Sequence, residues 1–157
     1  MIEVTNFLKG KSEEVTKRMG LEAEASVSTD DDRVMVELKA RDEEDTPLLI
    51  GFHGQTLNSL QTILRTMAFR AFGEVPSVLV EVGDYRRNRE EEITRRALEA
   101  ADKTRFLLKE VSFPAMSAYE RRIIHIALSG EKGVRTESRG EGRERHVVVV
   151  PEGQGRD

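Results

Sequence analysis

Two short motifs contain the polar side chains that are the best candidates for binding an anionic ligand. The first is Gly51-Phe52-His53-Gly54, which is followed by Gln55. A tight glycine turn lets a phosphate backbone approach closely, and the first N–H groups of a following helix can bind an anion. A glycine turn that only joins two helices has the same pattern, so this second interpretation stays open beside phosphate binding.

The second motif is Arg121-Arg122-Ile123-Ile124-His125. Arg121 and His125 are four residues apart, so on a helix their side chains lie within about 40° of each other, and Arg122 lies beside them on a solvent-facing strip. Such a strip could bind a phosphate, because a guanidinium forks onto its oxygens and an imidazole can donate or stack. Spacing alone favours the alternative of a solvated face whose arginine pairs with a nearby glutamate.

The helices and strands predicted around the first motif form a small structure in which helices pack on a sheet. Hydrophobic residues recur every three or four positions in the predicted helices and alternate with polar residues in the predicted strands. The predicted elements are a helix over residues 3–19, strands at 23–27 and 34–40 with a turn at 30–32, a short helix at 48–50, a helix over 56–72 and a strand at 78–82. The residues predicted to face the core from the 56–72 helix are Leu57, Leu60, Leu64, Met67 and Ala71. The glycine motif therefore lies between two helices of an α+β unit over residues 1–83.

The second motif lies in another unit, over residues 84–157. A long helix is predicted at 85–108, and its inward face is predicted to contain Ile93, Ala97, Ala101 and Leu108. Ser117 and Glu120 have the spacing of a capping box and open a further helix, whose apolar arc is predicted to include Tyr119. A hairpin with strands at 134–139 and 146–150 completes the unit.

Charge divides the chain into two unlike halves. The net charge is −4, but residues 1–83 carry nine Lys and Arg against 15 Asp and Glu, whereas residues 84–157 carry 16 against 14. The chain has 18 Arg and seven Lys, and arginine makes bidentate phosphate contacts that lysine cannot make. The second half is therefore the better candidate for binding a polyanion, although a charged surface of a heat-adapted protein would have the same composition.

Composition excludes several classes of function. The 157 residues contain no cysteine and three histidines, which excludes disulfides and thiolate metal sites and leaves few ligands for any other metal. No apolar run approaches the roughly 18 residues that a membrane span needs. The N-terminus lacks the basic and then apolar layout of a signal peptide. We expect a cytoplasmic protein without a metal or another cofactor.

The residues around both motifs resemble a known family. The stretch at 119–128, together with Thr-Glu-Ser-Arg-Gly-Glu-Gly at 136–142 and the valine-rich strand after it, is similar to the R-three-H domain, named for an Arg and a His separated by three residues. The stretch at 49–57 resembles the glycine loop of a KH domain of type II topology. With Gly-Asp-Tyr-Arg at 83–86, these motifs resemble the bacterial Jag family, also called KhpB or EloR, over most of residues 1–151.

The resemblance implies an α+β chain with a KH type II domain (α-β-β-α-α-β) over residues 1–83 and a small α/β R-three-H domain with an antiparallel sheet over 84–157. It implies a cytoplasmic protein that binds single-stranded RNA, or single-stranded DNA, without catalysis and that is linked to cell elongation and division. It also implies pairing with the small KH protein KhpA or with a second copy, and an association with the insertase SpoIIIJ (YidC) without membrane insertion. Many members carry a further N-terminal domain and a charged linker, which we do not recognise in these 157 residues.

The predicted nucleic-acid contacts combine the two motifs with arginines of the predicted hairpin. They are Gly51, Phe52, His53, Gly54, Gln55, Arg121, Arg122, His125, Arg139, Arg143 and Arg145. Two other functions remain open: an adaptor whose acidic first half mainly dimerises, with RNA binding incidental, and a phosphodiesterase that uses His125. The enzyme is the weakest of these hypotheses, because no carboxylate or second histidine is spaced to give a base, an orienting group and a metal ligand.

Overall fold

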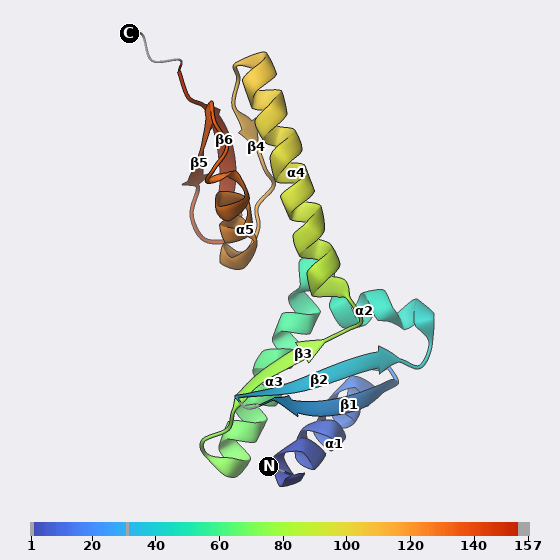
Figure 1. Ribbon diagram of the computed structural model, residues 1–157. Helices are drawn as coiled ribbons and strands as arrows, with labels where there is room; N and C mark the ends of the chain where they lie inside the picture. Colours follow the sequence, from blue (N-terminus) through green and yellow to red (C-terminus); the bar gives the residue numbers. More distant parts are fainter. Residues whose placement is uncertain (1, 31, 154–157) are drawn as a thin grey trace. The chain divides into compact units, whose positions relative to one another are not determined.

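The chain folds into two compact units of mixed helix and sheet. The structure is a computed structural model that describes residues 2–30 and 32–153. Its two units are Met1–Arg86 and Arg87–Asp157, here called unit 1 and unit 2 (Figure 1). Both units have the α+β composition that the sequence predicted. Across residues 2–30 and 32–153, no helix is long and apolar enough to cross a membrane.

Unit 1 is a three-stranded sheet with helices packed on it. Its elements are α1 (Ile2–Arg18), β1 (Ala23–Asp30), β2 (Arg33–Ala40), the 3-10 turn η1 (Glu43–Asp45), α2 (Thr46–Ile50), the 3-10 turn η2 (Phe52–Gly54), α3 (Gln55–Phe72) and β3 (Ser77–Glu81). The strand order is β1-β2-β3, with β1 antiparallel and β3 parallel to β2. A parallel pair needs a crossover, and the glycine motif lies in the crossover from β2 to β3. The centre of the predicted turn at 30–32, Asp31, lies outside the described residues.

The core of unit 1 lies between the sheet and helices α1 and α3. Alternate residues of β2 are buried, as the sequence predicted: Val34, Val36, Leu38 and Ala40. The predicted row of α3 is correct for Leu57, Leu60 and Leu64. It is wrong after that point, since Ala68 is the next buried residue while Met67 is half-buried and Ala71 is exposed. A step of four residues returns to within about 40° of the same helix face, which favours Ala68 over Met67.

Unit 2 is a long helix and a short helix packed on a second three-stranded sheet. Its elements are α4 (Tyr85–Leu107, whose first turn begins in unit 1), β4 (Val111–Ser112), α5 (Ala118–Leu128), β5 (Val134–Arg139), the 3-10 turn η3 (Gly142–Glu144) and β6 (His146–Pro151). The strand order is β4-β6-β5, with both pairs antiparallel. The predicted hairpin is present, and β4, with two residues, is too short to produce an alternating pattern.

The core of unit 2 lies between α4, α5 and the sheet, and α4 contributes Ile93 and three alanines to it. Ile93, Ala97 and Ala101 are buried as predicted, but Leu108 lies beyond the helix end, is 75% exposed and has a φ of 52°. The prediction for Leu108 was therefore wrong, because the helix ends one residue earlier. Ser117 caps α5 as predicted, since its hydroxyl oxygen accepts from the backbone N–H of Glu120 at 3.2 Å. The Glu120 side chain does not complete the predicted capping box, because it pairs with Arg89 instead.

Tyr119 is exposed, so its predicted place on the apolar arc of α5 was also wrong. Its relative exposure is 61%, and its hydroxyl lies 3.4 Å from Oε2 of Glu90. The neighbouring residue, Glu120, takes the inward position instead and pairs with Arg89 at 2.9 Å. An ion pair between α4 and α5 therefore occupies a place that the sequence pattern assigns to an aromatic ring.

Candidate nucleic-acid interface

The glycine motif forms a tight turn between α2 and α3. Gly51 has φ 73° and ψ −179°, Gly54 has φ 77° and ψ 15°, and His53 has a φ of 50°. A Cβ on Gly51 would lie 2.1 Å from Thr56 Oγ1, and one on Gly54 would lie 2.9 Å from Cε1 of Tyr85. The turn therefore requires glycine at both positions, for its backbone conformation and for its packing.

The two middle residues of the motif are exposed to solvent. Phe52 is 71% exposed, and its ring stacks on that of His53 with centroids 4.0 Å apart and 18° between the ring planes. Gln55, the first residue of α3, is also exposed. The loop thus presents a flat ring surface of the kind on which nucleotide bases stack, but it contains no lysine or arginine.

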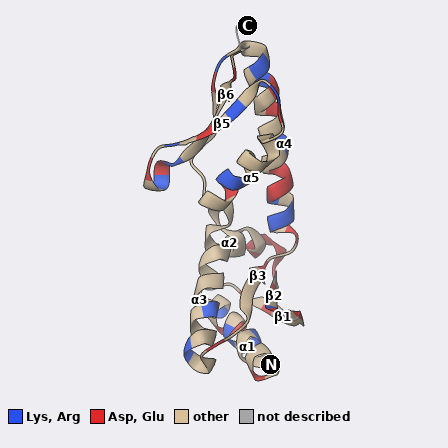
Figure 2. Cartoon of the chain, turned by 60° about the vertical axis from the view of Figure 1, so that its left-hand side comes forward, with Lys and Arg blue, Asp and Glu red and all other residues tan. Residues whose placement is uncertain are grey.

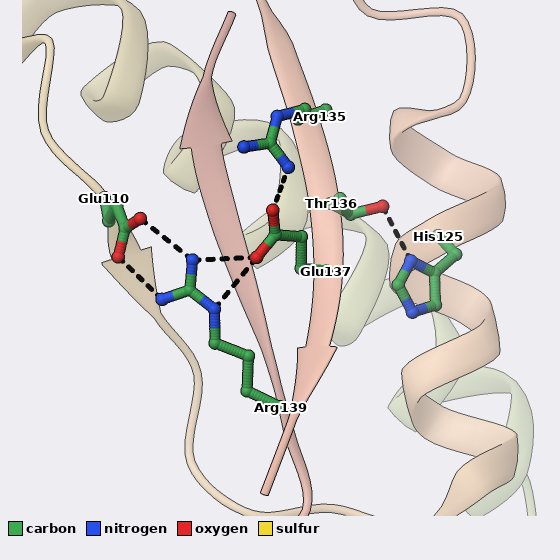
Figure 3. Close-up of polar contacts among 6 residues, drawn as sticks. All are labelled: Glu110, His125, Arg135, Thr136, Glu137 and Arg139. Atoms are coloured by element: carbon green, nitrogen blue, oxygen red, sulfur yellow. Dashed lines mark hydrogen bonds and ion pairs between the residues drawn. The ribbon is translucent and has the colours of Figure 1, made fainter.

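His125 lies against strand β5, not on the solvent-facing strip that the sequence predicted. Its Nδ1 lies 2.6 Å from Thr136 Oγ1 (Figure 3), and its Nε2 lies 3.0 Å from Ser138 Oγ. The prediction was wrong because spacing along a helix gives the angle between two side chains, not the side that a distant strand covers. Arg121 is half-buried, and its Nη1 donates to the backbone oxygen of Met116 at 2.9 Å.

The surroundings of His125 favour the neutral imidazole. Burial lowers the pKa of His125 below its ordinary value, and the positive charge of Arg121 lowers it further. In a neutral imidazole one ring nitrogen donates and the other accepts, and the hydroxyls of Thr136 and Ser138 can complement both. His125 therefore joins α5 to β5.

This contact predicts a stability that depends on pH. Because the pKa of His125 is lower in the folded protein, the unfolded state binds more protons once the pH falls below the ordinary value of 6.5. The stability that His125 contributes should be complete above this pH and should decline as the pH falls toward the folded-state pKa. Urea denaturation of the wild type and of His125→Gln should therefore differ less at about pH 5.5 than at about pH 7.5. An equal difference at both values contradicts the assignment.

Arg139 is held by two carboxylates on the opposite face of β5. Its Nη1 and Nη2 lie 2.8 and 2.9 Å from the two carboxylate oxygens of Glu110, and its Nε lies 2.9 Å from Oε2 of Glu137 (Figure 3). Glu137 also pairs with Arg135. The hydrogen bond from Arg139 holds the pKa of Glu110 below its ordinary value, and Glu110 raises the pKa of Arg139. No local pattern indicates this contact, because Glu110 lies far from Arg139 along the chain.

Four of the predicted contact arginines have no carboxylate partner. In the described part of unit 2, no Asp or Glu lies within ion-pair distance of Arg121, Arg122, Arg143 or Arg145. Met116 joins two of them, since its oxygen accepts from the Arg121 side chain and its N–H donates to the backbone oxygen of Arg145 at 3.2 Å. The start of α5, where Figure 2 shows basic residues, therefore lies beside the end of the turn between β5 and β6.

Two other arginines of residues 84–157 form ion pairs with glutamates of their own unit. Arg86 Nε lies 3.1 Å from Glu81 Oε1 in unit 1, and Arg89 Nε lies 2.9 Å from Glu120 Oε1 in unit 2. A count of charges along the chain cannot distinguish such arginines from those that remain available to a ligand. Among the residues that the structure describes, no cluster of three His, Asp or Glu could hold a metal ion.

Comparison with known proteins finds a domain match in the second half of the chain and several similar proteins. Residues 90–151 match the R-three-H domain. The chain is 38% identical over 108 residues to RNA-binding protein KhpB of Bacillus subtilis (strain 168), which covers 68% of this chain and 52% of that protein. It is 38% identical over 106 residues to RNA-binding protein KhpB of Clostridium symbiosum, covering 68% and 48%. The protein of the same name from Streptococcus pneumoniae serotype 2 is 30% identical over 132 residues, covering 84% and 40%. The chain spans about half the length of the first two of these curated relatives.

Proposed function

We infer that this chain is a member of the KhpB family, also called Jag, and propose that it binds single-stranded RNA without catalysing a reaction. The R-three-H match over residues 90–151 and the relatives named RNA-binding protein KhpB support this proposal. We expect the binding to take place in the cytoplasm and to act in the control of cell elongation and division, as the family resemblance implies.

The observation that carries the proposal is the group of arginines around Met116 that lack a carboxylate partner. A guanidinium that is not already held by a carboxylate can fork onto phosphate oxygens. Arg122 on α5 and Arg143 on η3 are both exposed, and they belong to the two segments that Met116 holds side by side. We therefore propose that these segments contact the phosphates of one RNA strand.

Replacing Arg122 and Arg143 together by alanine should weaken binding of a labelled oligouridine about tenfold and lower the salt slope by about 1.4, since each neutralised phosphate adds about 0.7 for single strands. Both side chains are exposed, so the fold should be unaffected. Fluorescence anisotropy at several salt concentrations measures both quantities.

The matched control replaces Arg95 and Arg96 by alanine. It removes the same charge from unit 2, but these side chains already pair with Glu99 and Glu92. An equal loss of affinity in both double variants would show that only net charge matters. A wild-type chain that does not bind the oligouridine would overturn the proposed RNA binding.

For unit 1 we propose a KH domain of type II, whose glycine loop clamps about four nucleotides. The order α1-β1-β2-α2-α3-β3 and the exposed stack of Phe52 on His53 support this assignment. Because residues 1–83 carry a net charge of −6 and the loop has no cation, we expect unit 1 to add less affinity than unit 2. In the same titration, replacing Phe52 and His53 by aspartate should therefore weaken binding less than the loss of the two arginines.

We also propose that unit 1 pairs with a second KH domain, either from another copy of this chain or from KhpA. Phe69 and Phe72, at the end of α3, are 58% and 37% exposed, and Phe69 lines a groove together with Arg65 and Val75. An association with the insertase SpoIIIJ (YidC) rests on the family resemblance alone. Light scattering of the chain with and without KhpA tests the pairing, and a monomer in both samples would overturn it. A dimer that does not bind RNA would favour the adaptor function.

A further inference from the structure

Strand β5 separates two sets of polar side chains. Successive residues of a strand point to opposite faces, and Thr136 and Ser138 face His125 on α5. Arg135, Glu137 and Arg139 lie on the other face of the strand (Figure 3). The proposed contacts at Arg122 and Arg143 do not use this second face. On this face, the Arg139 guanidinium binds the Glu110 carboxylate with the geometry of a phosphate contact.

Glu110 binds Arg139 in the way that a phosphate would. Its two carboxylate oxygens lie 2.8 and 2.9 Å from the two terminal nitrogens of the guanidinium, which is a bidentate pair. Guanidinium groups recognise phosphates by the same pair of parallel N–H···O bonds. The carboxylate oxygens of Glu110 therefore stand where two phosphate oxygens would bind.

The pair is exposed enough to open at little cost. The Arg139 and Glu110 side chains are 41% and 47% exposed. Ion pairs between exposed side chains contribute little net stability, because water solvates the separated charges well and salt screens their attraction. Glu110 comes from the segment just before β4, and its side chain can turn into solvent while the strands stay paired.

We propose that Glu110 is an intramolecular competitor that sets the affinity of Arg139 for the phosphodiester groups of RNA. An incoming phosphate displaces the Glu110 carboxylate and takes over its two hydrogen bonds. Glu137 keeps the guanidinium in position, since its Oε2 lies 2.9 Å from Nε and 2.8 Å from Nη2 of Arg139. This inference rests on the proposed RNA binding and adds a residue that lowers affinity to those that raise it. A purely structural role is the alternative, since charged side chains on an edge strand also prevent pairing with another chain.

The test uses the full chain, a labelled oligouridine and the variant Glu110→Gln at low salt. Glutamine keeps the size of the side chain but removes the charge that competes with phosphate, so binding should become about threefold tighter. The matched control is Glu99→Gln, which removes the same charge from another exposed arginine pair of unit 2, Arg95–Glu99 at 2.6 Å. Glu99→Gln should bind like the wild type. Circular dichroism should confirm that both variants are folded.

The double variant Glu110→Gln/Arg139→Ala separates competition from a general change in charge. In the Arg139→Ala background there is no guanidinium to release, so Glu110→Gln should no longer raise the affinity. A gain that persists without Arg139, or a Glu110→Gln variant that binds no tighter than Glu99→Gln, overturns the inference and leaves the RNA binding of the wild type standing. If the wild type itself does not bind, the proposed function and this inference both fail.

Discussion

Replacing Gly51 by alanine should lower the free energy of unfolding of unit 1 by about 3 to 5 kcal/mol. With φ 73° and ψ −179°, Gly51 has a backbone conformation that is almost restricted to glycine. A Cβ would also lie 2.1 Å from Oγ1 and 2.7 Å from Cβ of Thr56, so the start of α3 must shift. Urea denaturation followed by circular dichroism measures the loss, and hydrogen exchange of the α3 amides assigns it to unit 1.

Gly73 provides a matched control for the energetic cost of placing alanine in a backbone conformation with positive φ. It has a φ of 77° and a ψ of −116°, and a Cβ at this position would meet nothing within 4 Å. Gly73→Ala should therefore show only the conformational cost, about 1 to 2 kcal/mol. If Gly51→Ala is no more destabilising than Gly73→Ala, the contact with Thr56 does not determine the shape of the loop.

Replacing Arg89 by methionine should destabilise unit 2 by about 3 to 5 kcal/mol. Arg89 and Glu120 form an ion pair at 2.9 Å with side chains that are only 15% and 7% exposed. Among the described residues, Oε2 of Glu120 has no hydrogen-bond partner, so the carboxylate depends on Arg89. Methionine keeps most of the side-chain volume but leaves a buried charge without compensation. The free energy of unfolding in urea measures the effect.

Two further variants test whether burial causes this loss. Arg95→Met breaks the exposed pair with Glu99 on the same helix and should cost less than about 1 kcal/mol. Arg89→Met combined with Glu120→Leu removes both charges and should recover most of the stability. A double variant as unstable as Arg89→Met alone would mean that the packing of Arg89 matters and its charge does not.

The sequence predicted local structure well because local structure depends on neighbouring residues. The alternation in β2, the leucines of α3 and the Ser117 cap all follow from spacings of two to four residues, and the structure contains each of them. The glycine motif could also be predicted, because a tight turn between two helices needs glycine at positions that are close together in the sequence.

The candidate site could be predicted only in part because the partners of its side chains are distant in the chain. The spacing of Arg121 and His125 is a local property, but the partners of His125 lie on β5 and those of Arg139 include Glu110. Whether an arginine is available to a phosphate depends on such contacts. A charge count therefore finds the basic half of the chain but not the residues in it that can bind.

The position of the tyrosines has a consequence for spectroscopy. The protein has two tyrosines and no tryptophan, and each unit contains one of them. Tyr85 packs against Gly54 and is half-buried, whereas Tyr119 is exposed on α5. Tyrosine fluorescence is thus free of tryptophan emission, and a soluble quencher should reach Tyr119 more readily than Tyr85. Variants with phenylalanine at one position or the other would give an optical signal from a single unit without an added dye.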